Sequence, residues 1–131
     1  MNTRLLLSAS AIVLAVFGIA GSFLPQELLA ALGVAPSAVL AVLVQVLAAA
    51  LFGFAMVNWM ARGSLIGGIY NRPVAIGNLA HFAIGAIALV KAVIAGQRQP
   101  IVLAMTAVYL VFAICFWLLY GRSPVKPVDT V

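Results

Sequence analysis

The sequence predicts an all-α protein: an up-down-up-down bundle of four transmembrane helices, with a short interfacial helix between the first and the second. The chain of 131 residues is 66% hydrophobic and only 7% charged, whereas soluble domains are about 25% charged. Four apolar runs cover residues 5–24, 38–60, 74–95 and 101–120. At about 1.5 Å per residue, each run is long enough to cross a hydrocarbon core of about 30 Å. No alternating strand pattern appears, and lipid offers no partners to backbone polar groups, so these runs are expected to be helices.

The first run also has features of a cleaved signal peptide. It combines a charged start at Arg4, an apolar stretch and the small residues of Ile19-Ala20-Gly21-Ser22. However, it is longer than the apolar region of about 7–15 residues in signal peptides, and the later runs are equally hydrophobic. We therefore expect a retained span. Residues 1–121 then form the transmembrane domain, and residues 122–131, with two prolines, form a polar cytoplasmic tail.

The segment PQELLAALGVAP, residues 25–36, predicts the interfacial helix. Pro25 suits a first helical turn, Glu27 favours the positive N-terminal end, and Gly33 can close the C-terminus. The segment's leucines, Leu28, Leu29 and Leu32, are expected to lie on the lipid. The linker GQRQP, residues 96–100, is so short that the last two spans should form an antiparallel hairpin.

The basic residues predict the orientation in the membrane. Five lie on one side: Arg4, Arg62, Arg72, Arg122 and Lys126; Lys91 and Arg98 lie near the other. By the positive-inside rule, both termini are cytoplasmic in a multi-pass protein of a bacterial inner (plasma) membrane. Because these charges are scattered at helix ends, the expected partner is the lipid bilayer and not nucleic acid.

Stripes of residues at helical spacing predict how the spans pack. The stripes on the first and third spans are small or polar: Ser8, Ala11, Ala15, Gly18 and Ser22, then Asn78, His81, Gly85, Ala88 and Ala92. Those on the second and fourth are larger: Gln45, Ala48, Phe52, Ala55 and Trp59, then Thr106, Tyr109, Ala113, Phe116 and Tyr120. We expect the small stripes to receive the aromatic side chains. Matching depths predict two hydrogen-bonded pairs, His81 with Tyr109 and Gln45 with Thr106.

Polar residues gather in residues 58–82, which hold three of the four Asn, the only His and two of the seven Arg and Lys. One hypothesis is a ligand site made of Arg62, Asn71, Arg72, Asn78, His81 and Tyr109. The N-terminus of the third span favours an anion, and two arginines can grip a phosphate while Gly63, Gly67 and Gly68 let backbone approach it. The alternative is a cytoplasmic turn with topology-determining arginines, a helix cap at Asn71 and one packed histidine.

Several chemistries are disfavoured by what the spans lack. No Asp or Glu is embedded in mid-membrane, which disfavours carboxylate-driven proton antiport of the small multidrug transporter type. One His and one Cys, Cys115, cannot form a zinc or di-iron site within one chain, and bis-His haem ligation would need two subunits. No cofactor is therefore expected. No nucleophile–base pair is visible, so enzymatic activity is not expected either.

The segment FGIAGSFLPQELLAALGV, residues 17–34, is followed by an apolar helix that ends in a basic turn. This arrangement resembles the small four-helix membrane proteins of the DoxX-like kind, many of them domains of unknown function. The resemblance covers the first three spans. It implies, for some members, an association with quinone-linked redox enzymes, and it transfers no catalytic residue to this chain.

Three functional hypotheses follow. The first is a non-enzymatic accessory or scaffold subunit, as a homo-oligomer or within a larger membrane complex. The alternative is a small transporter or binding protein for an anionic or amphiphilic molecule, a lipid headgroup or small anion, at the cytoplasmic leaflet. The third is a quinone-associated redox subunit.

Overall fold

The computed structural model describes residues 2–35, 37–63 and 71–121. It contains five helices in these ranges: α1 (Thr3–Phe23), α2 (Pro25–Ala31), α3 (Ala38–Ala61), α4 (Asn71–Ile94) and α5 (Pro100–Gly121), with no strand among them. The four long helices are each apolar and long enough to cross a membrane. The predicted all-α, four-helix architecture is confirmed, and the protein is a small multi-pass integral membrane protein. The predicted tail, residues 122–131, lies outside the described ranges.

Three of the long helices begin before the apolar runs that predict them. Asn2 caps α1 by accepting hydrogen bonds at Oδ1 from the backbone N–H groups of Arg4 (3.1 Å) and Leu5 (3.4 Å). The helix α4 begins at Asn71 rather than Val74, so Pro73 lies in its first turn, where a backbone N–H is not needed. The start of α5 is Pro100 instead of residue 101. The difference has one cause: hydropathy marks the hydrocarbon core, whereas helices continue to the polar residues and prolines that begin them.

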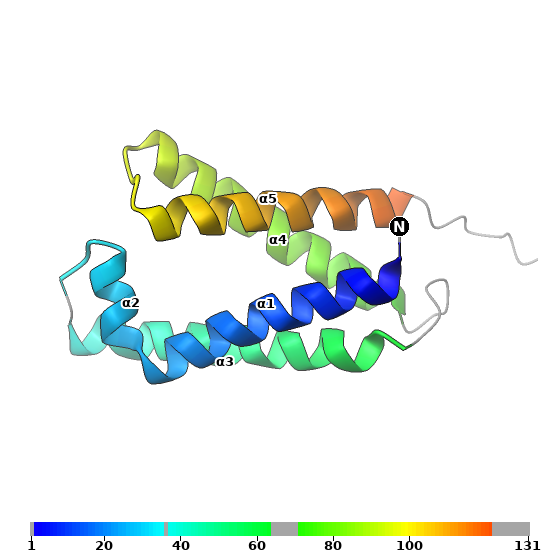
Figure 1. The fold of residues 1–131 in the computed structure, drawn as a ribbon, viewed down its shortest axis with the longest axis horizontal. Helices are drawn as coiled ribbons and strands as arrows, with labels where there is room; N and C mark the ends of the chain where they lie inside the picture. The colour runs from blue at the N-terminus through cyan, green and yellow to red at the C-terminus, as the bar shows by residue number, and fades with distance from the viewer. Residues whose placement is uncertain (1, 36, 64–70, 122–131) are drawn as a thin grey trace, which may run out of the picture.

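The helices are arranged as two antiparallel pairs (Figure 1). The first hairpin, α1 with α3, is closely packed along its length, and so is the second hairpin, α4 with α5, whereas contacts between the hairpins are few. We call the end where α1 and α4 begin and α3 and α5 end the base, and the opposite end, which holds α2, the far end. The chain therefore runs up, down, up and down as predicted.

Glycines bring the backbones of α1 and α3 together. A Cβ atom on Gly18 would lie 2.9 Å from the backbone N of Phe52, and one on Gly21 would lie 2.7 Å from Cβ of Ala48. The predicted small stripe of α1 is therefore correct at Gly18. The predicted aromatic side chains of α3 differ in their positions: the Phe52 side chain remains 39% exposed, against the prediction, whereas Trp59, although 44% exposed, lines a groove together with the small residues Ala11 and Ala15 of α1. At Gly18 and Gly21 the two backbones are too close for a ring to lie between the helices.

Buried aromatic rings hold the second hairpin together and join it to α1. Phe82 of α4 is fully buried, and its ring stacks on Phe112 and Phe116 of α5 at centroid distances of 4.8 and 5.7 Å. Leu14 of α1 belongs to the same core cluster. A Cβ on Gly85 would lie 2.5 Å from Cε1 of Tyr109, so this aromatic ring does occupy the small stripe of α4, as predicted. The next residue of this stripe, Ala88, is exposed.

The short helix α2 turns its leucines inward. Gly33 ends it with a positive φ of 74°, and the N–H groups of Gly33 and Val34 donate to the carbonyls of Ala30 and Leu29, each at 2.9 Å. The predicted helix and its glycine C-terminus are confirmed. The predicted lipid contact of the leucines is wrong: Leu29 is only 4% exposed, and Leu28 and Leu32 line a cavity that α1, α3 and α5 also line. Their side chains cover the space left where the two hairpins diverge.

We predict that Gly21→Ala destabilises the protein by about 1–3 kcal/mol, because its new methyl group overlaps Ala48 and forces α1 away from α3. The matched change Gly53→Ala adds a Cβ that meets nothing within 4 Å, so it should stabilise α3 by about 0.5–1 kcal/mol through helix propensity. Reversible unfolding in mixed micelles measures both. Equal effects of the two substitutions would contradict close packing of α1 on α3.

Candidate functional site

Three buried polar side chains join α1, α3 and α4 near the base. Asn58 of α3 and Asn78 of α4 are both 0% exposed, as is Ser10 of α1. Nδ2 of Asn58 donates to Oδ1 of Asn78 (2.7 Å), and Nδ2 of Asn78 donates back to Oδ1 of Asn58 (2.6 Å). Nδ2 of Asn58 also donates to Oγ of Ser10 at 3.0 Å. We call these three side chains the Asn–Asn–Ser network.

The network is closed, because each of its donors has an acceptor within the bundle. The Ser10 hydroxyl donates to the carbonyl of Leu7 at 3.0 Å, and the second N–H of Asn78 donates to the carbonyl of Val74 at 2.9 Å. A buried polar group left unpaired costs about 1–3 kcal/mol, so both amides depend on each other. The predicted ligand site included Asn78. In the structure, the Asn78 amide instead forms hydrogen bonds that hold helices together. The predicted ligand site did not include Asn58. Its position in the same polar stretch, residues 58–82, was the sequence signal that could have identified it.

The predicted pair of His81 and Tyr109 is confirmed. The Tyr109 hydroxyl lies 3.2 Å from Nε2 of His81, and the Tyr109 ring rests on Gly85, one turn further along α4. The half-buried imidazole also stacks on Phe54 of α3, with centroids 5.4 Å apart and planes at 25°. His81 therefore contacts both hairpins, roughly one turn from the Asn–Asn–Ser network.

The predicted pair of Gln45 and Thr106 is wrong. Nε2 of Gln45 donates to the backbone carbonyl of Ser22 at 3.2 Å, within the first hairpin. The Thr106 hydroxyl donates to the carbonyl of Val102 at 2.7 Å, within α5 itself. Equal depth in the membrane does not place two side chains on facing sides of their helices. These two belong to different hairpins, which make few contacts with each other.

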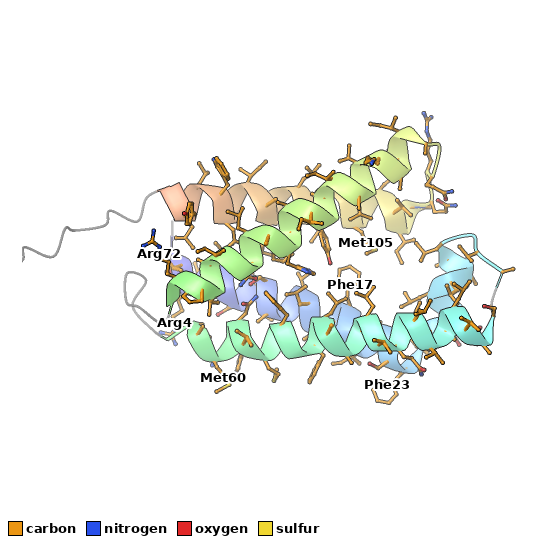
Figure 2. The ribbon with its side chains drawn as sticks, turned by 180° about the vertical axis from the view of Figure 1, so that it is seen from behind. Arg4, Phe17, Phe23, Met60, Arg72 and Met105 are labelled. Atoms are coloured by element: carbon orange, nitrogen blue, oxygen red, sulfur yellow. The ribbon has the colours of Figure 1, made fainter. Side chains whose placement is uncertain are left out.

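The arginines of the predicted anion site have separate surroundings. The Arg62 guanidinium lies 3.3 Å from the centroid of the Trp59 ring, and its Nη1 donates to the Trp59 carbonyl at 3.1 Å. Arg72 is exposed in the first turn of α4, at the same end of the bundle as Arg4 (Figure 2). Gly63 is exposed, whereas Gly67, Gly68 and the side chain of Asn71 lie outside the described part of the chain. The cation–π contact thus gives Arg62 a defined place beside α3.

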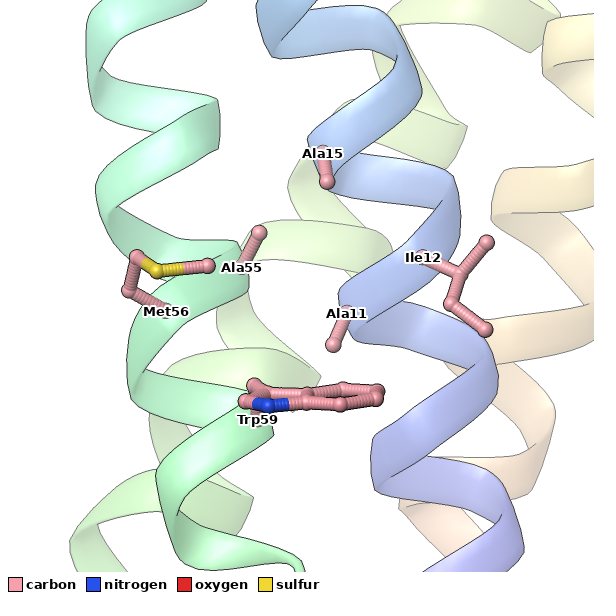
Figure 3. Close-up of a pocket in the computed structure, with 6 residues that line it drawn as sticks. All are labelled: Ala11, Ile12, Ala15, Ala55, Met56 and Trp59. Atoms are coloured by element: carbon pink, nitrogen blue, oxygen red, sulfur yellow. The ribbon is translucent and has the colours of Figure 1, made fainter.

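An apolar groove of about 200 Å³ lies between α1 and α3 beside this arginine. Its lining residues are Ala11, Ile12, Ala15, Ala55, Met56 and Trp59. Figure 3 shows the Trp59 indole extending from α3 towards α1 at one end of the groove. Since Arg62 lies on the same indole, the groove combines hydrocarbon walls with one nearby positive charge. A tryptophan followed by an arginine three residues later was the sequence signal for this pair.

Comparisons with protein-family models, with curated proteins and with solved structures find no match to this chain. The resemblance to DoxX-like proteins stays a prediction from residues 17–34. Functional inference therefore depends on the geometry of the bundle.

We predict that Asn58→Leu and Asn78→Leu each destabilise the protein by about 1–3 kcal/mol, because each strands the other amide in the core. The double substitution should cost less than the sum, with a coupling of about 0.6–2 kcal/mol. Unfolding free energies of the two single variants, the double variant and the unchanged protein complete the cycle. Additive effects would contradict a direct amide–amide interaction.

Proposed function

We propose that this protein is a non-enzymatic accessory subunit of a membrane assembly, binding a membrane-embedded partner through the outward faces of its helices. The observation that supports this most directly is the weak association of its two hairpins. In the most apolar 18-residue stretch of α1, 39% of the residues are buried, whereas in that of α4 only 17% are. Most of the helix surface is therefore available to lipid or to another membrane protein.

The outward face of α3 suits close contact with a partner helix. Ala49, Ala50 and Gly53 are exposed side by side, and a Cβ on Gly53 would meet nothing within 4 Å. Small residues let helix backbones approach closely, which is the main source of association energy in lipid. The exposed face of α4 differs, because Ala80 lies between the exposed Ile76 and Ile84, one turn away on either side. We therefore place the partner on α3.

The proposed setting is a bacterial inner membrane with the base in the cytoplasm. Among the described residues, Arg4, Arg62 and Arg72 lie at the base, whereas Lys91 and Arg98 lie towards the far end. This asymmetry supports the orientation through the positive-inside rule.

The test is native mass spectrometry of the protein extracted gently from its own membranes. We expect a stable assembly that contains a second copy or another chain. Gly53→Leu should dissociate it, because the added side chain fills the shallow face of α3, while the matched control Ala80→Leu should leave it intact. Bare monomers from the unchanged protein, or equal effects of both substitutions, would overturn the proposal.

A second candidate function is the binding of an anionic amphiphile in the groove beside Trp59. The specific support is the position of Arg62, whose guanidinium lies against the indole that lines this groove. An acyl chain would lie along the apolar walls, and Arg62 would face the phosphate, which matches the geometry of a guanidinium.

For this second candidate, we expect Arg62→Gln to weaken binding of phosphatidylglycerol about five-fold, the equivalent of about 1 kcal/mol per basic residue near an anionic lipid. Binding of diacylglycerol, which has no phosphate, should not change. Arg4→Gln, which removes another exposed arginine at the base, serves as the control for general surface attraction. Equal losses in the two variants, measured by lipid titration in native mass spectra, would contradict a defined site.

A further inference from the structure

The groove beside Trp59 presents three kinds of chemical group in a fixed order along α3. Arg62 caps the helix at the base, and Trp59 lies in the last helical turn. The lining residues Ala55 and Met56 lie about one turn, or roughly 5 Å, further from the base. Starting from the base, a positive charge is therefore followed by an indole ring and then by hydrocarbon walls.

The indole of Trp59 carries a hydrogen-bond donor for which the described part of the chain provides no acceptor. The ring face is covered by the Arg62 guanidinium, and the Trp59 carbonyl accepts from Nη1 of Arg62, but nothing in these ranges accepts from Nε1 of the indole. Trp59 itself lines the groove and is 44% exposed, so a molecule in the groove contacts this ring directly. Figure 3 shows the indole nitrogen at the end of the ring nearer α3, the helix that Arg62 caps.

A glycerophospholipid in the leaflet at the base carries its own groups in a matching order. Its phosphate is outermost, its ester carbonyls follow, and its acyl chains extend into the hydrocarbon. The phosphate suits the guanidinium, and a chain suits the apolar walls. The ester carbonyls lie between the two and are hydrogen-bond acceptors. Trp59 is the one lining residue of the groove with a side-chain donor, and it also lies between the charge and the walls.

We propose that the indole N–H of Trp59 donates a hydrogen bond to an ester carbonyl of the bound lipid. This inference rests on the second candidate function, the binding of an anionic amphiphile in this groove, and it names the ligand class: ester-linked glycerophospholipids. An ether-linked lipid that covers the groove displaces water from the N–H and supplies no carbonyl in its place, which leaves a donor unpaired. Trp59 is thus the residue that determines the preference for ester over ether lipids.

The ester contact is tested with two phosphatidylglycerols whose hydrocarbon chains have equal length, one joined by ester bonds and the other by ether bonds. Delipidated protein in detergent is titrated with each lipid, and native mass spectra give the two affinities. The diacyl lipid should bind about five-fold more tightly, as expected for one net hydrogen bond. Equal affinities, or tighter binding of the dialkyl lipid, would overturn the proposal.

The two tryptophans of the chain provide a matched pair of variants. Trp59→Phe keeps an aromatic ring beside Arg62 but removes the N–H, so it should abolish the preference for the diacyl lipid. Trp117→Phe makes the same change at a 66% exposed position of α5 and should retain the preference. Thermal unfolding verifies that both variants fold, and the ratio of the two lipid affinities is unaffected by a loss of packing common to both lipids. A preference that persists in Trp59→Phe would overturn the assignment of the indole N–H.

The hydrogen bond itself has a spectroscopic signature. In Trp117→Phe, Trp59 is the one remaining tryptophan, and ultraviolet resonance Raman spectra report hydrogen bonding of its indole N–H. The diacyl lipid should shift the N–H-sensitive band to that of a hydrogen-bonded indole, whereas the dialkyl lipid should not. A band that responds equally to both lipids would overturn the proposal.

Arg62→Gln separates this contact from the function on which it rests. The substitution should weaken binding of the diacyl and dialkyl lipids by the same factor, because both carry the same phosphate, so the roughly five-fold ratio is retained. If Arg62→Gln weakens binding but the unchanged protein binds the two lipids equally, the phosphate site stands and the ester contact is refuted. If neither lipid responds more to Arg62→Gln than to Arg4→Gln, the binding function and the ester contact are both overturned.

Discussion

The pair of asparagine amides between α3 and α4 is the interaction on which the arrangement of the bundle depends. Asn58 and Asn78 satisfy each other at 2.7 and 2.6 Å, and Asn58 also reaches Ser10 of α1. In hydrocarbon there is no water to replace these partners, so separating the helices at this point exposes two amides to an apolar medium. The network therefore fixes the register of three helices where the hairpins meet. The stacked rings of Phe82, Phe112 and Phe116 add apolar contacts between α4 and α5.

This location of the polar contact explains the shape of the far end. The Asn–Asn–Ser network and the His81–Tyr109 pair both lie in the half of α4 that is nearer the base. Beyond Gly85, Ile87 and Ala88 are exposed, so they do not pack α4 against the first hairpin. The short helix α2 and its inward leucines occupy part of the resulting space, and an apolar cavity remains.

The polar residues consequently divide into two groups with different roles. Those near the junction, including Asn78, His81 and Tyr109, bond to one another and hold the helices in place. A polar group that is available to a ligand lies elsewhere: the Arg62 guanidinium on the Trp59 ring. It lies beside the apolar groove that Trp59 lines. Such a combination suits an amphiphile better than a small soluble anion, because an anion alone gains nothing from hydrocarbon walls.

Much of this protein could be predicted from its sequence, because the bilayer constrains it so strongly. Hydrophobic length determined the four spans, glycine and proline determined α2 and its ends, and depth along two neighbouring helices was sufficient to pair His81 with Tyr109. The rotation of each helix about its axis could not be predicted from the sequence, because hydropathy is nearly uniform around these spans. Only the tertiary structure decided that Asn58 faces Asn78, that Gln45 and Thr106 bond within their own hairpins, and that the leucines of α2 point inward. In lipid, the choice of facing sides comes from close packing and from pairing of a few polar groups, which are properties of the assembled helices.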